Sequence, residues 1–295
     1  MKKKLLSAFI GSLSLLESAG QTSSAIKAPV SDLAHIDVIL DSATWHAIKS
    51  NSFIQNQFGV LNVDTAYYGG KPSYDLYVLG KLSFLHISLA KGFWADRRGS
   101  GVLVFQSRKP GMIDPILNSW KQFYKDSLFI HTYKGNDFTL EEVLAWYKHD
   151  STKPKEARLF ANLTSYSPDA YRNWGITDSI VEAGLSLKQF LGDWGGEPLK
   201  TRLFNSITEL YMTVNQQEFK EIRSALLSTG YTEDNNIFTH SFNPKIYISK
   251  SEEKGKSKYS KVKFKLNSPV AERVIVFGPT AILKLNGEEG WFIFN

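Results

Sequence analysis

The side chains best suited to chemistry in this chain lie at alternate positions of short segments with strand-like patterning. In HIDVILD, His35 and Asp37 alternate with apolar residues, and in SFLHISL, His86 and Ser88 do the same. Successive side chains of a strand point to opposite faces, so each segment carries its polar groups on one face. Imidazole and carboxylate groups transfer protons and bind divalent cations. A face that carries them either meets bulk water or lines a wet pocket.

Two later segments have the same alternation. In ELYMTVN, Glu209 and Tyr211 face away from the apolar side, and in AILKLNG, Lys284 and Asn286 do so. If these faces line a pocket, the candidate ligand contacts beside the histidines are Asp37, Ser88, Tyr211, Lys284 and Asn286. A metal-free acid–base role for a histidine–glutamate pair is one chemistry that such a pocket would allow.

An internal repeat predicts how these segments are positioned. LYVLGKLSFLHISLAKGFW, residues 76–94, aligns without a gap to VIVFGPTAILKLNGEEGWF, residues 274–292, at an offset of 198 (274 minus 76). Each copy has the period-two pattern of a hairpin. A strand and a helix precede each hairpin, with Ser42 as the predicted N-cap of the first helix and Gly230 ending the second. Both halves therefore predict a β-α-β-β-β order.

The predicted organisation is two modules, residues 33–107 and 207–295, around a central region, residues 108–206. That region mixes predicted helices at 115–124 and 140–148 with predicted strands at 128–133 and 157–163. It either caps the core or walls a cavity.

Two modules of this kind, with a closing hairpin of the type YVLG…SFLHISL, resemble the vicinal oxygen chelate superfamily, which includes glyoxalase I, extradiol dioxygenases and bleomycin-resistance proteins. The resemblance covers the two modules and not the central region. It implies an α+β fold in which two glyoxalase-like βαβββ modules form a curled mixed sheet around a cavity, with a large α/β insertion between them. It also implies that a small molecule binds in the cavity.

Metal-dependent members of that superfamily take ligands from the first and last strands of each module. Carried over by position, the resemblance implies His35, His86 and Glu209 as a three-ligand site for iron(II) or manganese(II). The fourth position holds Lys284, whose ammonium group repels a cation. This departure leaves three-ligand lyase, isomerase or ring-cleaving dioxygenase chemistry open and argues against a four-ligand site.

The alternative is a non-enzymatic binding or interaction protein without a metal or other cofactor. Lys284 would then form an ion pair with Glu209, and His35 and His86 would hydrogen-bond to Asp37, Ser88 or water. The modules could also pair between two chains, which would make a homodimer.

Composition limits the remaining possibilities. The first 25 residues place three lysines before an apolar run, as in a secretory signal peptide, which predicts an exported, soluble protein of the periplasm or the extracellular space without a stable membrane anchor. The chain contains no cysteine, which excludes disulfides, zinc–thiolate sites and cysteine nucleophiles. A lysine-rich run at residues 250–265 is typical of a solvated hairpin edge, so we expect no nucleic-acid partner.

Overall fold

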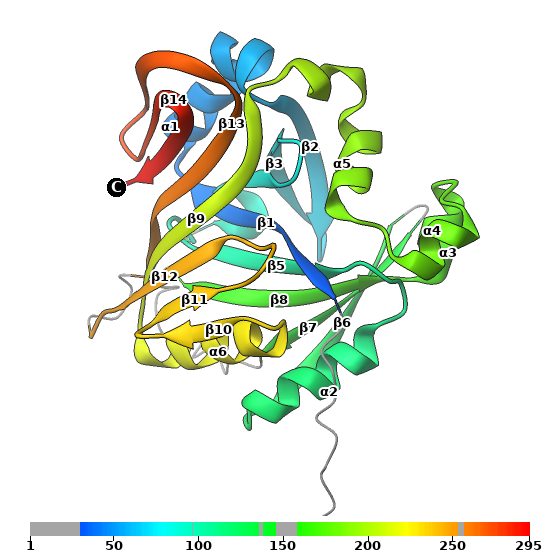
Figure 1. Cartoon of the computed structure of the whole chain (residues 1–295). Helices are drawn as coiled ribbons and strands as arrows, with labels where there is room; N and C mark the ends of the chain where they lie inside the picture. The colour runs from blue at the N-terminus through cyan, green and yellow to red at the C-terminus, as the bar shows by residue number, and fades with distance from the viewer. Residues whose placement is uncertain (1–29, 96, 136–137, 146–157, 253–256) are drawn as a thin grey trace, which may run out of the picture.

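The computed structural model describes residues 30–95, 97–135, 138–145, 158–252 and 257–295. The fold is of the mixed α+β type, and its larger sheet curls into a half-barrel (Figure 1). In sheet order, that sheet consists of β2 (Val60–Tyr68), β3 (Lys71–Leu79), β4 (Phe84–Leu89), β1 (Ser31–Leu40), β5 (Gly101–Ser107), β8 (Leu159–Tyr166), β7 (Thr139–Ala145) and β6 (Leu128–Lys134). The predicted signal peptide lies outside the described residues.

A second sheet of six strands is formed by the C-terminal part of the chain. Its order is β10 (Thr232–Asp234), β11 (Ile237–Thr239), β12 (Lys245–Lys250), β9 (Phe204–Val214), β13 (Lys258–Phe277) and β14 (Ala281–Phe294). The α-helices are α1 (Ser42–Ser50), α2 (Ile113–Phe123), α3 (Pro168–Asn173), α4 (Asp178–Ala183), α5 (Leu187–Gly195) and α6 (Gln216–Ser228). The described elements also include three short helical segments that are not α-helices: η1 (Ile54–Phe58), η2 (Gly92–Trp94) and η3 (Glu197–Thr201). No helix in the described ranges is both long enough and apolar enough to cross a membrane.

The two halves of the chain share a strand topology. In the first half β1 pairs in parallel with β4, and β5 lies antiparallel on its other side. In the second half β9 pairs in parallel with β12, and β13 lies antiparallel on its other side. The order β1-α1-β2-β3-β4 is thus matched by β9-α6-β10-β11-β12.

This topology corrects the sequence alignment of the two hairpins. The strand that corresponds to β4 is β12, whereas the aligned segment, residues 274–292, covers the end of β13 and most of β14. Register places Tyr247 opposite Tyr211, as it places His86 opposite Asp37, and Lys284 instead lies opposite Val274. Any two antiparallel hairpins that bury one face share a period-two pattern around a turn, so the alignment matched a general pattern.

The central region extends the first sheet. β8 pairs in parallel with β5, and β7 and β6 continue the sheet outward. Leu128–Lys134 and Leu159–Tyr166 are strands, in agreement with the sequence, but the helix predicted over residues 140–148 is wrong, because Thr139–Ala145 forms β7. The segment contains strong helix formers, and pairing with β6 and β8 overrides that local preference.

Side-chain capping fixes where the two repeated helices begin. Asp41, rather than the predicted Ser42, caps α1 and accepts a hydrogen bond from the backbone amide of Thr44 at 3.0 Å. Asn215 caps α6 in a capping box with Glu218. Both caps directly follow the last residue of the preceding strand, so each helix starts at the C-terminal end of that strand.

The largest hydrophobic core cluster contains residues from both halves, and Phe58 lies where the halves meet. Its ring stacks on Phe204 with 5.3 Å between centroids and an angle of 6° between planes. It also makes edge contacts with Phe264 and Phe292, at 5.2 and 6.0 Å. This aromatic cluster holds the second sheet against the half-barrel.

Candidate functional site

The half-barrel contains a cavity of about 660 Å³. Its lining comes from strands β1 to β8 and from the segment 174–194, which includes most of α5. No strand of the second sheet contributes to it. A cavity of this volume can take up an ordinary small molecule.

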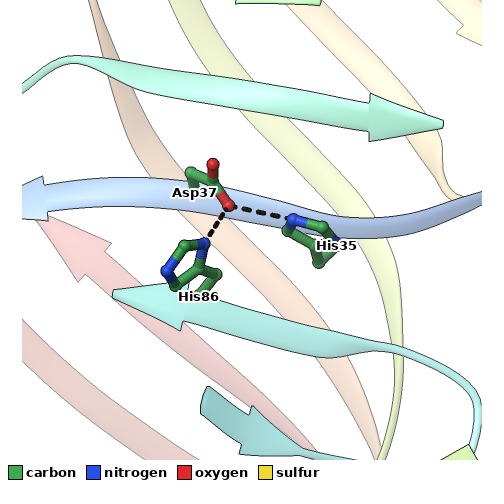
Figure 2. Close-up of side chains that lie close together, drawn as sticks. All are labelled: His35, Asp37 and His86. Atoms are coloured by element: carbon green, nitrogen blue, oxygen red, sulfur yellow. Dashed lines mark hydrogen bonds and ion pairs between the residues drawn. The ribbon is translucent and has the colours of Figure 1, made fainter. Parts of the chain in front are cut away.

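Two histidines and an aspartate form a close group on the wall of this cavity. His35 and Asp37 are two residues apart on β1, so their side chains leave the same face, and His86 lies opposite Asp37 on the parallel strand β4. Figure 2 shows all three side chains converging on one point. Asp37 Oδ1 is 2.7 Å from His86 Nδ1 and 3.1 Å from His35 Nε2.

A second carboxylate lies behind His86. Asp75 on β3 is inaccessible to solvent, and its Oδ1 lies 3.1 Å from His86 Nε2. The hydroxyls of Ser73 and Ser88 donate to the same oxygen at 2.8 and 2.7 Å. Trp94 Nε1 donates in turn to Ser73 Oγ at 3.0 Å. The orientation of the His86 ring is therefore fixed by a buried hydrogen-bond network.

Burial and mutual attraction shift the pKa values of the three groups in different directions. Burial opposes the charged form of His86, but Asp37 and Asp75 outweigh it and raise the pKa of His86 to about 10. Burial alone would raise the pKa of Asp37, yet the neighbouring His86 and His35 hold it far below its usual range. Burial lowers the pKa of His35, which favours the neutral ring. In the metal-free state the two neighbouring carboxylates thus favour the protonated form of His86.

The spacing of the three groups also fits a divalent metal ion. Ligand atoms about 2.1 Å from a metal and at right angles to each other lie about 3.0 Å apart. The two measured separations from Asp37 Oδ1 are 2.7 and 3.1 Å, and one ligand atom from each residue lies within 4.8 Å of the others. Two imidazoles and one carboxylate are the donor set of facial iron(II) sites. Asp75 lies beside the second nitrogen of His86. Many metal-binding histidines are oriented by a carboxylate in this position.

Rings stack on the two histidines. Phe84 lies against His35 with 4.3 Å between centroids, and Tyr77 lies against His86 with 4.5 Å and 13° between planes. Burial raises the pKa of the Tyr77 hydroxyl, as do the charges of Asp75 and other neighbours. The side of the site nearest these rings is therefore largely aromatic.

The structure brings together two of the three ligands expected from the sequence. His35 and His86 lie in the group, but Glu209 does not. Its carboxylate accepts a hydrogen bond from the hydroxyl of Tyr211 and lies 3.4 Å from Lys263 Nζ on β13. Glu209 is the positional counterpart of His35 on β9, so it belongs to the other sheet. Asp37 supplies the carboxylate instead, because i and i+2 positions of one strand share a face.

Most of the remaining predicted contacts lie elsewhere. Of those candidates only Asp37 lines the cavity. Ser88 is buried against Asp75, and Tyr211 stacks on Tyr247 with 4.4 Å between centroids. Lys284 and Asn286 are exposed on β14. The expected Lys284–Glu209 ion pair is replaced by Lys263–Glu209, because β13 lies between β9 and β14.

Sequence reasoning missed several residues of the site. Asp75 carried a usable signal, since SYDLYVL places Ser73, Asp75 and Tyr77 on one strand face. Glu142, whose carboxylate lies 3.6 Å from His131 Nδ1 at the cavity wall, was hidden in the segment predicted as a helix. The aromatic residues of the segment 174–194 had no periodic signal that would assign them to a cavity.

Comparison with known proteins adds a family but no activity. A family model with the description "Family of unknown function (DUF5829)" matches residues 33–294. No curated protein matches the chain significantly.

Proposed function

We propose that in this chain, which belongs to this family of unknown function, the half-barrel cavity binds a small molecule beside a divalent metal ion. The residues that would hold the ion are His35, Asp37 and His86. The observation that carries the proposal is the convergence of two imidazoles and one carboxylate at the wall of a cavity. A buried Asp75 that fixes the orientation of His86 supports it further.

Three ligands on one side of an ion leave positions open for a substrate and for water or oxygen. Iron(II) or manganese(II) in such a site would polarise an oxygen of the substrate, as metal-assisted lyases, isomerases and ring-cleaving dioxygenases require. His35 and His86 would supply neutral nitrogen donors, and Asp37 would neutralise part of the ionic charge. Phe84 and Tyr77 would shield the site from water.

A relation to the vicinal oxygen chelate superfamily is part of the proposal. The parallel pairing of the first and last strands in both β-α-β-β-β segments supports it. The cavity differs from the expected one, because the first segment and the strands β5 to β8 form it, not a pair of segments. Export and a homodimer likewise stay proposals drawn from the sequence.

Metal analysis of the purified protein tests the site. We expect one iron(II) or manganese(II) per chain after reconstitution, and an affinity at least about tenfold lower after His35→Ala, Asp37→Asn or His86→Ala. His46→Ala is the matched control, because His46 is exposed on α1 and outside the cavity. Absence of stoichiometric metal, or equal affinity in all four variants, would overturn the proposal.

One observation favours a second candidate, a small-molecule site without metal. Both nitrogens of His86 already lie beside carboxylate oxygens, at 2.7 and 3.1 Å, so the ring can act as a fixed cation without an ion. The cavity would then bind its ligand through His35 and the aromatic walls. Ligand binding that is unchanged by a chelator would favour this candidate over the first.

A further inference from the structure

The charge and the walls of the cavity indicate the class of its ligand. We propose that the cavity binds an organic cation, an amine or quaternary ammonium compound with an apolar body. The inference rests on the proposal that the cavity binds a small molecule, and it does not depend on the metal ion.

The ionisable lining is predominantly acidic. Asp37, Asp64, Glu142 and Asp193 line the cavity, whereas no lysine or arginine of the described residues does so. The bases in the lining are three histidines: His35 and His86 lie beside Asp37, and His131 lies 3.6 Å from Glu142. An anionic ligand would meet four acidic side chains and no lysine or arginine of the described residues, whereas a cation would be attracted by them.

Glu142 is the carboxylate best placed to meet a ligand charge. It extends from β7, which β5 and β8 separate from β1 in the sheet, so it lies about 14 Å along the sheet from Asp37. The curl of the sheet turns both residues toward the same cavity. Burial raises the pKa of Glu142, the nearby His131 lowers it, and the negative charge of Asp37 raises it again. Because the net shift of the pKa is upward, a bound ammonium group would stabilise the ionised form of Glu142 beyond what His131 provides.

Aromatic rings form the apolar part of the cavity wall. Trp194 on α5 makes edge contacts with Tyr77 and Phe84, both at 5.3 Å between centroids, and Trp174 makes one with Tyr166 at 4.8 Å. Trp194 is 39% exposed although it lines the cavity, so ring surface remains free for contact. Aromatic faces attract organic cations, most strongly where water is excluded.

The lysine-rich strand of the protein does not alter this charge balance. Lys258, Lys261, Lys263 and Lys265 all lie on β13 of the second sheet, and none of them lines the cavity. The net positive charge of the whole chain therefore coexists with an acidic cavity. Selection for a cation is a property of the half-barrel alone.

Three probes of similar size and different charge test the inference: 2-phenylethylamine, 2-phenylethanol and 3-phenylpropionate. Their binding to the full chain can be followed by tryptophan fluorescence, since Trp174 and Trp194 line the cavity, and by calorimetry. We expect the amine to bind at least about tenfold more tightly than the alcohol, which corresponds to about 1.4 kcal/mol, and the propionate to bind most weakly. Equal or tighter binding of the propionate, or no binding of the amine at about 10 mM, would overturn the inference.

Variants locate the charge recognition. Glu142→Gln should weaken amine binding by at least about fivefold and leave alcohol binding within about twofold. Glu141→Gln is the matched control, because Glu141 is the adjacent residue on β7 and does not line the cavity. If Glu142→Gln fails to fold, Asp193→Asn is the second test, because Asp193 lines the cavity and is exposed on α5. This variant should also weaken amine binding. An equal loss of amine binding in the Glu141 variant would contradict the inference.

Measurements with and without a chelator separate this inference from the metal proposal. A preference for the amine that persists in the metal-free protein supports the cation site even if no metal binds. Stoichiometric metal binding together with a preference for the propionate would support the metal site and overturn the cation site.

Discussion

His86 Nε2 lies 3.1 Å from Oδ1 of Asp75, a carboxylate without solvent exposure whose oxygen also accepts hydrogen bonds from two serines. The contact leaves only Nδ1 of His86 directed at Asp37 and the cavity. Asp75 therefore determines which nitrogen of His86 is available to a metal ion and increases the basicity of that nitrogen.

Asp75→Asn tests this positioning role. The amide oxygen can still accept a hydrogen bond from His86, but the negative charge is lost, so we expect metal affinity to fall about 10- to 100-fold while the stoichiometry stays the same. Asp126→Asn, which removes an exposed carboxylate paired with Lys220 outside the cavity, is the control and should leave metal affinity unchanged. Titration with manganese(II) measures both. Unchanged affinity in the Asp75 variant would show that the contact has no role in binding.

Gly101 is a close-packed position beside the same site. A Cβ atom added there would lie 2.5 Å from the backbone oxygen of Asp37 and 2.4 Å from a ring carbon of Tyr259. Gly101→Ala must displace β1 or the buried Tyr259 ring, so we expect a loss of about 1–3 kcal/mol of stability and weaker metal binding. Thermal unfolding and metal titration measure the two effects.

Gly192→Ala is the matched control for this change. Gly192 lies inside α5, and an added Cβ would meet no atom within 4 Å. Alanine has the higher helix propensity, so we expect this variant to be more stable by up to about 1 kcal/mol. If Gly101→Ala behaved in the same way, the close packing around Asp37 would not constrain the site.

Sequence patterning was sufficient to predict the strands of the first half that carry the site. Alternation placed His35, Asp37 and His86 on one face, and the pairing of β1 with β4 brings them together as that alternation requires. The same pattern could not identify the partner of each strand, because period two is common to all half-buried strands. Lys284 was assigned to the position of His86 for this reason, whereas Tyr247 occupies it.

The spacing of residues along the sequence could not predict which carboxylate joins the two histidines. Glu209 is the repeat counterpart of His35, and only the arrangement of the two sheets shows that it contacts Lys263 instead. Glu142 enters the cavity because β7 pairs with β8, a long-range contact that overrides the helical preference of its segment. Local propensity cannot reveal such pairings in advance.

Phe58 is the residue through which the two halves are expected to stabilise each other. It is fully buried and contacts Phe204, Phe264 and Phe292 of the second sheet. We expect Phe58→Ala to reduce the free energy of unfolding by about 3–5 kcal/mol, because the cavity left behind cannot close. Phe129→Ala, at a ring that is 36% exposed, is the control and should cost much less. Denaturant unfolding compares the two, and equal losses would contradict a special role for Phe58.

Glu218 gives a prediction for the effect of pH on stability. Its side chain is buried at the start of α6, where Ser257 Oγ and the backbone amide of Asn215 donate to its carboxylate. Burial raises its pKa above the ordinary value of 4.5, although both hydrogen bonds act in the opposite direction. A carboxyl group with a raised pKa in the folded state stabilises the fold most below pH 4.5, and that contribution is lost as the pH rises through the folded-state pKa.

Glu218→Gln carries a side chain that does not ionise, so it should avoid this loss. We therefore expect the free energy of unfolding of the variant to rise relative to that of the unmodified chain as the pH increases from about 4 to 8. Urea unfolding at several pH values measures this difference, and comparison within each pH cancels the contributions of the groups that do not interact with Glu218. A difference that is constant, or that changes in the opposite direction, would show that the hydrogen bonds from Ser257 and Asn215 fully compensate the burial of the charge.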